Sequence, residues 1–206
     1  MNRQYALLLP GLLLVPALLA DTPRYGVGVG PNTSIVVTNA RAASGNQCLR
    51  FSDHPDAERP GYPYLFVRPD FLEEGAEFSC RLCLEPGAIV TLQFRTQTNA
   101  RNFPVGPSLQ FSGEGVKAGN RRVADMPLNE WVGVQVSFRF GTGTFDLVFT
   151  PPAGAPVRRE ELPCQSPDFK RCTWVGFIGS SAEQTRFYLD DLEVLPTSDR
   201  LPSRKN

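Results

Sequence analysis

The chain has 206 residues, of which 41% are hydrophobic and 20% charged, and its 21 Lys and Arg residues balance its 21 Asp and Glu residues. This balance excludes the strongly basic surface of a nucleic-acid-binding protein, so we expect no nucleic-acid partner. The length suffices to bury one sizeable hydrophobic core, and all-β sandwiches of this size commonly fold as one domain.

Residues 1–20 have the pattern of a secretory signal peptide. Arg3 supplies a positive charge, Ala6–Leu19 is almost wholly apolar, and Ala20 is a small residue suited to cleavage before Asp21. The apolar run is shorter than the roughly 20 residues of a membrane-spanning helix and contains prolines, so we expect no transmembrane anchor. The mature protein is therefore expected to be secreted, periplasmic or held at the cell surface.

Residues 21–32 contain the alternating run Gly26-Val27-Gly28-Val29-Gly30. The run imitates a nucleotide-binding loop, but no strand is predicted before it and no helix after it. We expect a flexible segment here. One domain is expected over residues 33–196, followed by a disordered polar tail over residues 197–206.

Apolar and polar residues then alternate with a period of two, which predicts β-strands. The alternating segments are residues 76–84, 90–95, 108–111, 132–140 and 144–150. Gly141-Thr142-Gly143 predicts a tight hairpin between the last two segments. Residues 173–179 are apolar on both faces, as in a covered central strand. At least eight short antiparallel strands with one apolar face each indicate an all-β, two-sheet sandwich.

The last predicted strand, residues 185–195, changes its alternation halfway. Phe187 and Leu189 share one parity, whereas Leu192 and Val194 have the other. A β-bulge near Asp190-Asp191 would let all four apolar side chains face the core. The expected core includes Val134, Val136, Phe138, Leu147, Trp174, Phe177 and Phe187.

Five cysteines in an exported chain permit disulfides but leave at least one thiol unpaired. Cys164 and Cys172 bracket a short loop and are the favoured pair. The alternative is that both are buried free thiols.

The carboxylates at the predicted bulge suggest a metal site. Asp190 and Asp191 would supply oxygen ligands of the kind that Ca²⁺ takes, with Asp53 or Asp56 from an acidic loop as further ligands. Ca²⁺ is thus a candidate structural cofactor, and no other cofactor is expected. The alternative is an outward, hydrogen-bonded pair that only ends the sheet.

Several segments together are similar to a known family. They are residues 46–53, 64–69, 105–109, 174–177 and 187–192. They resemble the concanavalin A-like, laminin-G-like jelly-roll domains of exported bacterial proteins. This resemblance implies a jelly-roll sandwich and makes Asp190 or Asp191 the metal-facing residue. It leaves the activity open, because such domains include lectins, carbohydrate-binding modules, glycosidases, lyases and adhesion domains.

A non-catalytic module that binds a carbohydrate or another extended polar ligand is the leading interpretation. Its ligand-contacting face would carry Gln93, Arg95 and Gln110, with Arg81, Gln135 and Arg139 as neighbours or rim. Arginine and glutamine offer multidentate hydrogen bonds to hydroxyls and carboxylates, so anionic polysaccharide, including a cell-surface glycan, is the preferred partner. The alternative is that this face is only a solvated surface.

Two other classes remain open. A polysaccharide lyase or glycoside hydrolase on the same fold would use Arg95 to neutralise a uronate and Tyr64 or Tyr188 as acid or base. No glucanase carboxylate motif and no lyase-like Tyr-x-Lys signature is present, so the sequence favours a protein without catalysis. The third class is a structural cell-surface interaction domain.

Overall fold

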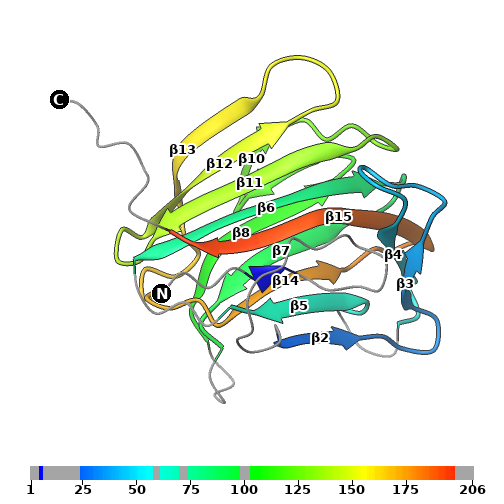
Figure 1. The fold of residues 1–206 in the computed structure, drawn as a ribbon, viewed down its shortest axis with the longest axis horizontal. Helices are drawn as coiled ribbons and strands as arrows, with labels where there is room; N and C mark the ends of the chain where they lie inside the picture. The colour runs from blue at the N-terminus through cyan, green and yellow to red at the C-terminus, as the bar shows by residue number, and fades with distance from the viewer. Residues whose placement is uncertain (1–4, 7–23, 58–60, 70–73, 98–102, 198–206) are drawn as a thin grey trace.

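The computed structural model describes residues 5–6, 24–57, 61–69, 74–97 and 103–197 (Figure 1). These residues form strands and no helix, which confirms the all-β prediction. The described part of the chain accordingly contains no helix long and apolar enough to cross a membrane. The predicted signal peptide, apart from residues 5–6, and the polar tail beyond residue 197 lie outside the described residues.

Two antiparallel sheets pack face to face as a jelly-roll sandwich (Figure 1). Sheet A has the strand order β13–β12–β11–β6–β15–β4–β3, and β1 pairs with β15. Its strands are β1 (Tyr5–Ala6), β3 (Ser34–Thr38), β4 (Cys48–Asp53), β6 (Gly75–Leu84), β11 (Val132–Arg139), β12 (Thr144–Thr150), β13 (Val157–Pro163) and β15 (Thr185–Pro196). Sheet B has the order β10–β9–β8–β7–β14–β5–β2. Its strands are β2 (Arg24–Gly28), β5 (Tyr64–Arg68), β7 (Val90–Arg95), β8 (Val105–Ser112), β9 (Gly115–Ala118), β10 (Arg121–Ala124) and β14 (Trp174–Gly179).

The core between the sheets follows the predicted alternation. In β6, Phe78 and Leu82 are buried between the sheets while Glu77 and Arg81 point to solvent. Phenylalanines from both sheets meet there: the rings of Phe78 and Phe94 are 5.4 Å apart, edge to face. Burying an aromatic or aliphatic side chain of this size contributes roughly 1.5–3 kcal/mol, so the paired apolar faces are the main source of stability.

Two local predictions are confirmed. The hairpin between β11 and β12 turns through Gly141 and Gly143, whose positive φ values of 82° and 70° suit glycine. The register between β15 and β6 shifts after Asp190, and Asp191 has a φ of 48°. This bulge lets Val194 return to the core, as the change of parity required.

The flexible segment predicted at residues 21–32 is wrong over β2. Arg24–Gly28 forms the edge strand of sheet B and pairs along its length with β5. The glycines suggested mobility, but Gly26 and Gly28 lie beneath the aromatic rings of Phe66 and Tyr64, where a side chain would clash. Their lack of a side chain is therefore a packing requirement.

The disulfide predicted between Cys164 and Cys172 is not formed, because all five cysteines are free thiols. Cys172 is buried in the core, and Cys164 is half-buried at its margin. Burial raises the pKa of Cys164 to about 11 and that of Cys172 to about 12. A short spacing in sequence does not fix the direction of the two Cβ atoms, which a disulfide requires.

Candidate functional site

The outer face of sheet B carries a row of aromatic rings, which we call the aromatic row: Tyr62, Tyr64, Phe66 and Trp174. The ring centroids are 5.4 Å apart for Tyr62 and Tyr64, 6.0 Å for Tyr64 and Phe66, and 5.6 Å for Phe66 and Trp174. The row runs from β5 to β14, and its tyrosine and phenylalanine rings are half-buried. A connected series of partly exposed rings can stack on an extended ligand with apolar faces.

Glycines in the neighbouring strand positions let these rings lie close to the sheet. A Cβ atom at Gly26 would be 2.4 Å from the ring of Phe66, and one at Gly176 would be 2.4 Å from the ring of Trp174. Gly28 lies beneath Tyr64 in the same way. Side chains at these positions would displace the rings. The glycines of the edge strand β2 and of the central strand β14 therefore shape the aromatic row.

Trp174 is buried, as predicted, but not between the two sheets. The side chain is 4% exposed, but it lies on the outer face of sheet B and not among the residues packed between the sheets. Arg95 covers it, with the guanidinium carbon 4.0 Å from the ring centroid. Strand β14 is apolar on both faces, as predicted, because Arg95 covers its outer face.

Arg95 extends the aromatic row with a cation. Its guanidinium carbon is also 4.7 Å from the ring centroid of Phe103. Its Nε and Nη2 atoms donate to Oε1 of Gln93 at 2.9 and 2.6 Å, and Gln93 Nε2 donates to Ser108 Oγ at 3.2 Å. Burial lowers the pKa of Arg95 to about 10. Among the described residues no carboxylate pairs with this guanidinium.

The six ligand-binding candidates predicted from the sequence lie on two opposite faces of the molecule. The outer face of sheet B carries Gln93, Arg95 and Gln110. The outer face of sheet A carries Arg81, Gln135 and Arg139. The second group therefore cannot be the neighbours or rim of a site at the first. Alternation had assigned every side chain to the outside correctly, but it does not say which sheet a strand joins.

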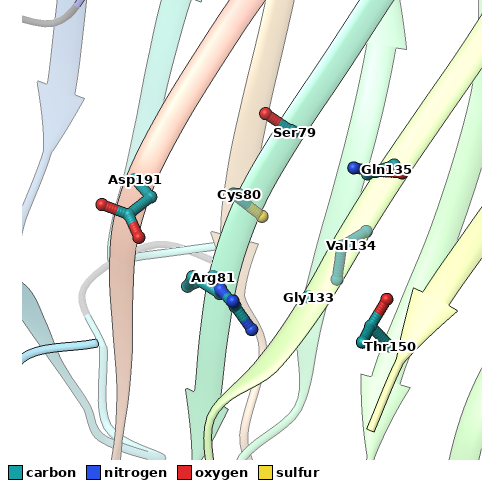
Figure 2. Close-up of a pocket in the computed structure, with 8 residues that line it drawn as sticks. All are labelled: Ser79, Cys80, Arg81, Gly133, Val134, Gln135, Thr150 and Asp191. Carbon is teal, nitrogen blue, oxygen red and sulfur yellow. The ribbon is translucent and has the colours of Figure 1, made fainter. Parts of the chain in front are cut away.

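The outer face of sheet A has a shallow hollow of its own (Figure 2). A depression of about 190 Å³ lies over β12, β11, β6 and β15. Its lining includes Ser79, Arg81, Gly133, Thr150 and Asp191. Figure 2 shows Arg81 extending from β6 toward β11, where Gly133 leaves room for it.

The Asp190-Asp191 bulge holds the loop before β4. Asp190 Oδ2 accepts from the backbone N–H groups of Ala43 and Ser44 at 2.8 and 3.2 Å, and its Oδ1 accepts from the Asp191 N–H at 2.9 Å. The Ser44 hydroxyl donates to Asp191 Oδ1. Carboxylates that already accept several N–H and O–H groups anchor a loop without any ion.

The proposed metal ligands do not fit a shared Ca²⁺ site. Asp53 pairs with Thr185 in the sheet register, so it lies roughly 17 Å along the strands from Asp190 at the usual rise per residue. Asp53 is buried and accepts from the N–H groups of His54 and Ser181, each at 2.8 Å. In the described part of the chain, no group of three or more His, Cys, Asp or Glu side chains could hold a metal ion.

The residues of the lyase alternative are not assembled. Tyr188 lies on the outer face of sheet A, opposite Arg95, and its hydroxyl donates to Glu85 at 2.8 Å. Burial and the Glu85 carboxylate raise its pKa, which keeps the hydroxyl protonated and so unavailable as a base near neutral pH. Tyr64 shares the face of Arg95, but Phe66 and Trp174 lie between them in the aromatic row.

The aromatic row was missed in the sequence, although a signal for it exists. In residues 64–67, Tyr64 and Phe66 alternate with Leu65 and Val67, so the two aromatic side chains must face away from the core. Two large rings on the solvent side of a strand are unusual enough to suggest a contact surface.

No protein-family model matches the sequence, and no curated protein matches it significantly. Solved structures share the fold. An endo-β-1,4-glucuronan lyase from Trichoderma reesei has a TM-score of 0.58 at 11% identity over 84% of this chain and 90% of that one. The cellulose-induced protein Cip1 has 0.57 at 9% identity over 84% and 92%. A Bauhinia forficata lectin in complex with GalNAc has 0.51 at 10% identity over 86% and 99%. The fold is thus concanavalin A-like, as expected.

Proposed function

We propose that the protein binds a carbohydrate on the outer face of sheet B, with the aromatic row and Arg95 as its main contacts. The single observation that carries this proposal is the aromatic row, in which three half-buried rings continue into the buried ring of Trp174 and the row ends in the Arg95 cation. Sugars present apolar C–H faces that suit aromatic rings, and hydroxyls that suit arginine and glutamine. The fold shared with a GalNAc-binding lectin supports a carbohydrate ligand in general.

An acidic polysaccharide is the ligand class that suits Arg95 best. A guanidinium has five N–H donors, of which Gln93 engages two, so donors remain for a carboxylate or sulfate. The group is partly desolvated without a described counter-ion, and a ligand anion would compensate its charge. Such charge-assisted pairs are among the stronger hydrogen bonds. The polysaccharide would then span the aromatic row with its neutral faces.

The test is retention on immobilised polygalacturonate, compared between the wild type and Arg95→Ala. We expect binding at least about tenfold weaker for the variant, since a hydrogen bond to a charged group contributes roughly 1.5–3 kcal/mol. Added salt should weaken the wild type toward the variant by screening. The melting temperature should change little, because losing the cation–π contacts is offset by relieving the desolvation of Arg95.

Arg158→Ala is the matched control, since it removes one exposed arginine from β13 in the other sheet. It should be retained like the wild type. Equal retention of the wild type and Arg95→Ala, or no retention of either on any acidic or neutral polysaccharide, would leave this face as a solvated surface and favour a structural interaction domain.

A further inference from the structure

We propose that the hollow on the outer face of sheet A is a second, separate binding site for a neutral oligosaccharide. It lies on the opposite side of the sandwich from the aromatic row, so one ligand chain cannot contact both sites along a straight path. The inference comes from the shape, the free polar groups and the charge of this face.

The hollow is longer than the part shown in Figure 2. A second depression of about 280 Å³ adjoins the first one of about 190 Å³, and Ser79 and Gln135 line both. Small-molecule sites typically measure roughly 300–1,000 Å³, a range that the adjoining pair reaches. Gly133 keeps the first depression open, because a Cβ atom there would lie 3.2 Å from Thr150 Cβ and 3.6 Å from Arg81 Nη1.

The hollow combines free hydrogen-bonding groups with an apolar floor. The side chains of Ser79, Gln135 and Ser137 make no hydrogen bond to any described residue, although they line the depressions. Val148 and Leu195 also line it and are half-buried, outward-facing apolar side chains. A sugar offers both complements, namely hydroxyls for the amide and serines and a C–H face for the aliphatic side chains.

The charges of the hollow select against an anionic ligand. Asp191, Glu77 and Glu193 contribute three carboxylates, whereas Arg81 is the single cation in the lining. None of the four forms an ion pair with a described residue. The negative excess repels a uronate or sulfate chain, while carboxylates accept hydrogen bonds from neutral sugar hydroxyls without that penalty. The two faces would therefore bind glycans of different charge.

Two sites on opposite faces would let one molecule bridge two polysaccharide chains. Weak contacts at each site then combine into firm attachment wherever both chains are held near each other, as in a wall or matrix.

Isothermal titration with neutral hexasaccharides of gluco, xylo, manno and galacto configuration tests this inference. Gly133→Val should fill the first depression and weaken binding by at least about tenfold. Gln135→Ala removes only an exposed amide that does not support the fold, and it should weaken binding about fivefold. Gln184→Ala, an exposed glutamine in a loop, is the matched control and should bind like the wild type.

If no hexasaccharide binds while polygalacturonate is still retained, this inference is wrong and the proposed function stands. It is also wrong if Gln135→Ala and Gln184→Ala bind equally well, or if oligogalacturonate competes for the same site. Binding of a neutral hexasaccharide that depends on Gln135 supports the second site. This holds even if Arg95→Ala leaves retention on acidic polysaccharide unchanged, a result that would contradict the proposed function alone.

Discussion

At the scale of single residues, the buried thiols lower the free energy of unfolding at alkaline pH. Cys172 is fully buried, and burial raises its pKa to about 12 from the ordinary 9.0. The folded state therefore keeps a proton that the unfolded state releases above pH 9. This contribution to stability is complete below pH 9 and is lost as the pH rises toward 12.

We expect Cys172→Ala to reduce this loss. Each pH unit within the window costs about 1.4 kcal/mol for a thiol that titrates only when unfolded. Urea unfolding at pH 8 and pH 10 should thus show a decrease about 1 kcal/mol larger for the wild type than for Cys172→Ala. Tyrosines and lysines contribute equally to both proteins. Identical decreases would mean that Cys172 ionises as easily in the folded protein as in the unfolded one.

At the residue scale, the alternation of polar and apolar residues predicts which side chains face outward, but it does not predict which sheet carries them. Alternation placed Gln93 and Arg95 on an outer face, and it did the same for Arg81 and Gln135. Parity is a local property of each strand. Membership of sheet A or sheet B depends on long-range pairing, which no local pattern encodes, so residues of two faces were combined into one predicted site.

At the scale of elements, β2 and β15 show which irregularities a sequence reveals. The bulge in β15 was predictable because Phe187, Leu189, Leu192 and Val194 could reach one core only if the register slipped. In β2 the pattern was ambiguous, since alternating glycines indicate either mobility or close packing. The rings of β5 that settle the question lie more than 30 residues away in sequence.

A change in β2 should therefore weaken ligand binding without unfolding the protein. In Gly26→Val the new Cβ must displace the ring of Phe66 and disrupt the aromatic row, whereas the edge position of β2 limits the damage to the core. Retention on polygalacturonate should fall by at least about threefold, given that an aromatic contact is worth roughly 0.5–1.5 kcal/mol. The melting temperature monitors the fold.

Val27→Ala is the matched control in the same strand. Val27 is 52% exposed and has the opposite parity, so it does not lie beneath the aromatic row. If both variants bind like the wild type, the position of Phe66 is unimportant for binding. If Gly26→Val unfolds, β2 is more than an edge strand.

At the scale of the whole molecule, the sandwich separates its two tryptophans onto opposite outer faces. Trp174 belongs to the aromatic row on sheet B, and Trp131 packs on Tyr188 on sheet A, with ring centroids 6.5 Å apart. The chain has two tryptophans in all. Each face thus has its own fluorophore, and the fluorescence of a single-tryptophan variant reports on one face alone.

The most direct test of the central claim is a titration of Trp131→Phe, in which Trp174 is the remaining fluorophore, with oligogalacturonate. Because the ligand anion engages Arg95 directly above the Trp174 ring, we expect a saturable change in emission that disappears when Arg95→Ala is added. Trp174→Phe, which retains Trp131, should show no change at the same ligand concentrations. A constant Trp174 signal, or a response from Trp131 instead, would contradict binding at the outer face of sheet B.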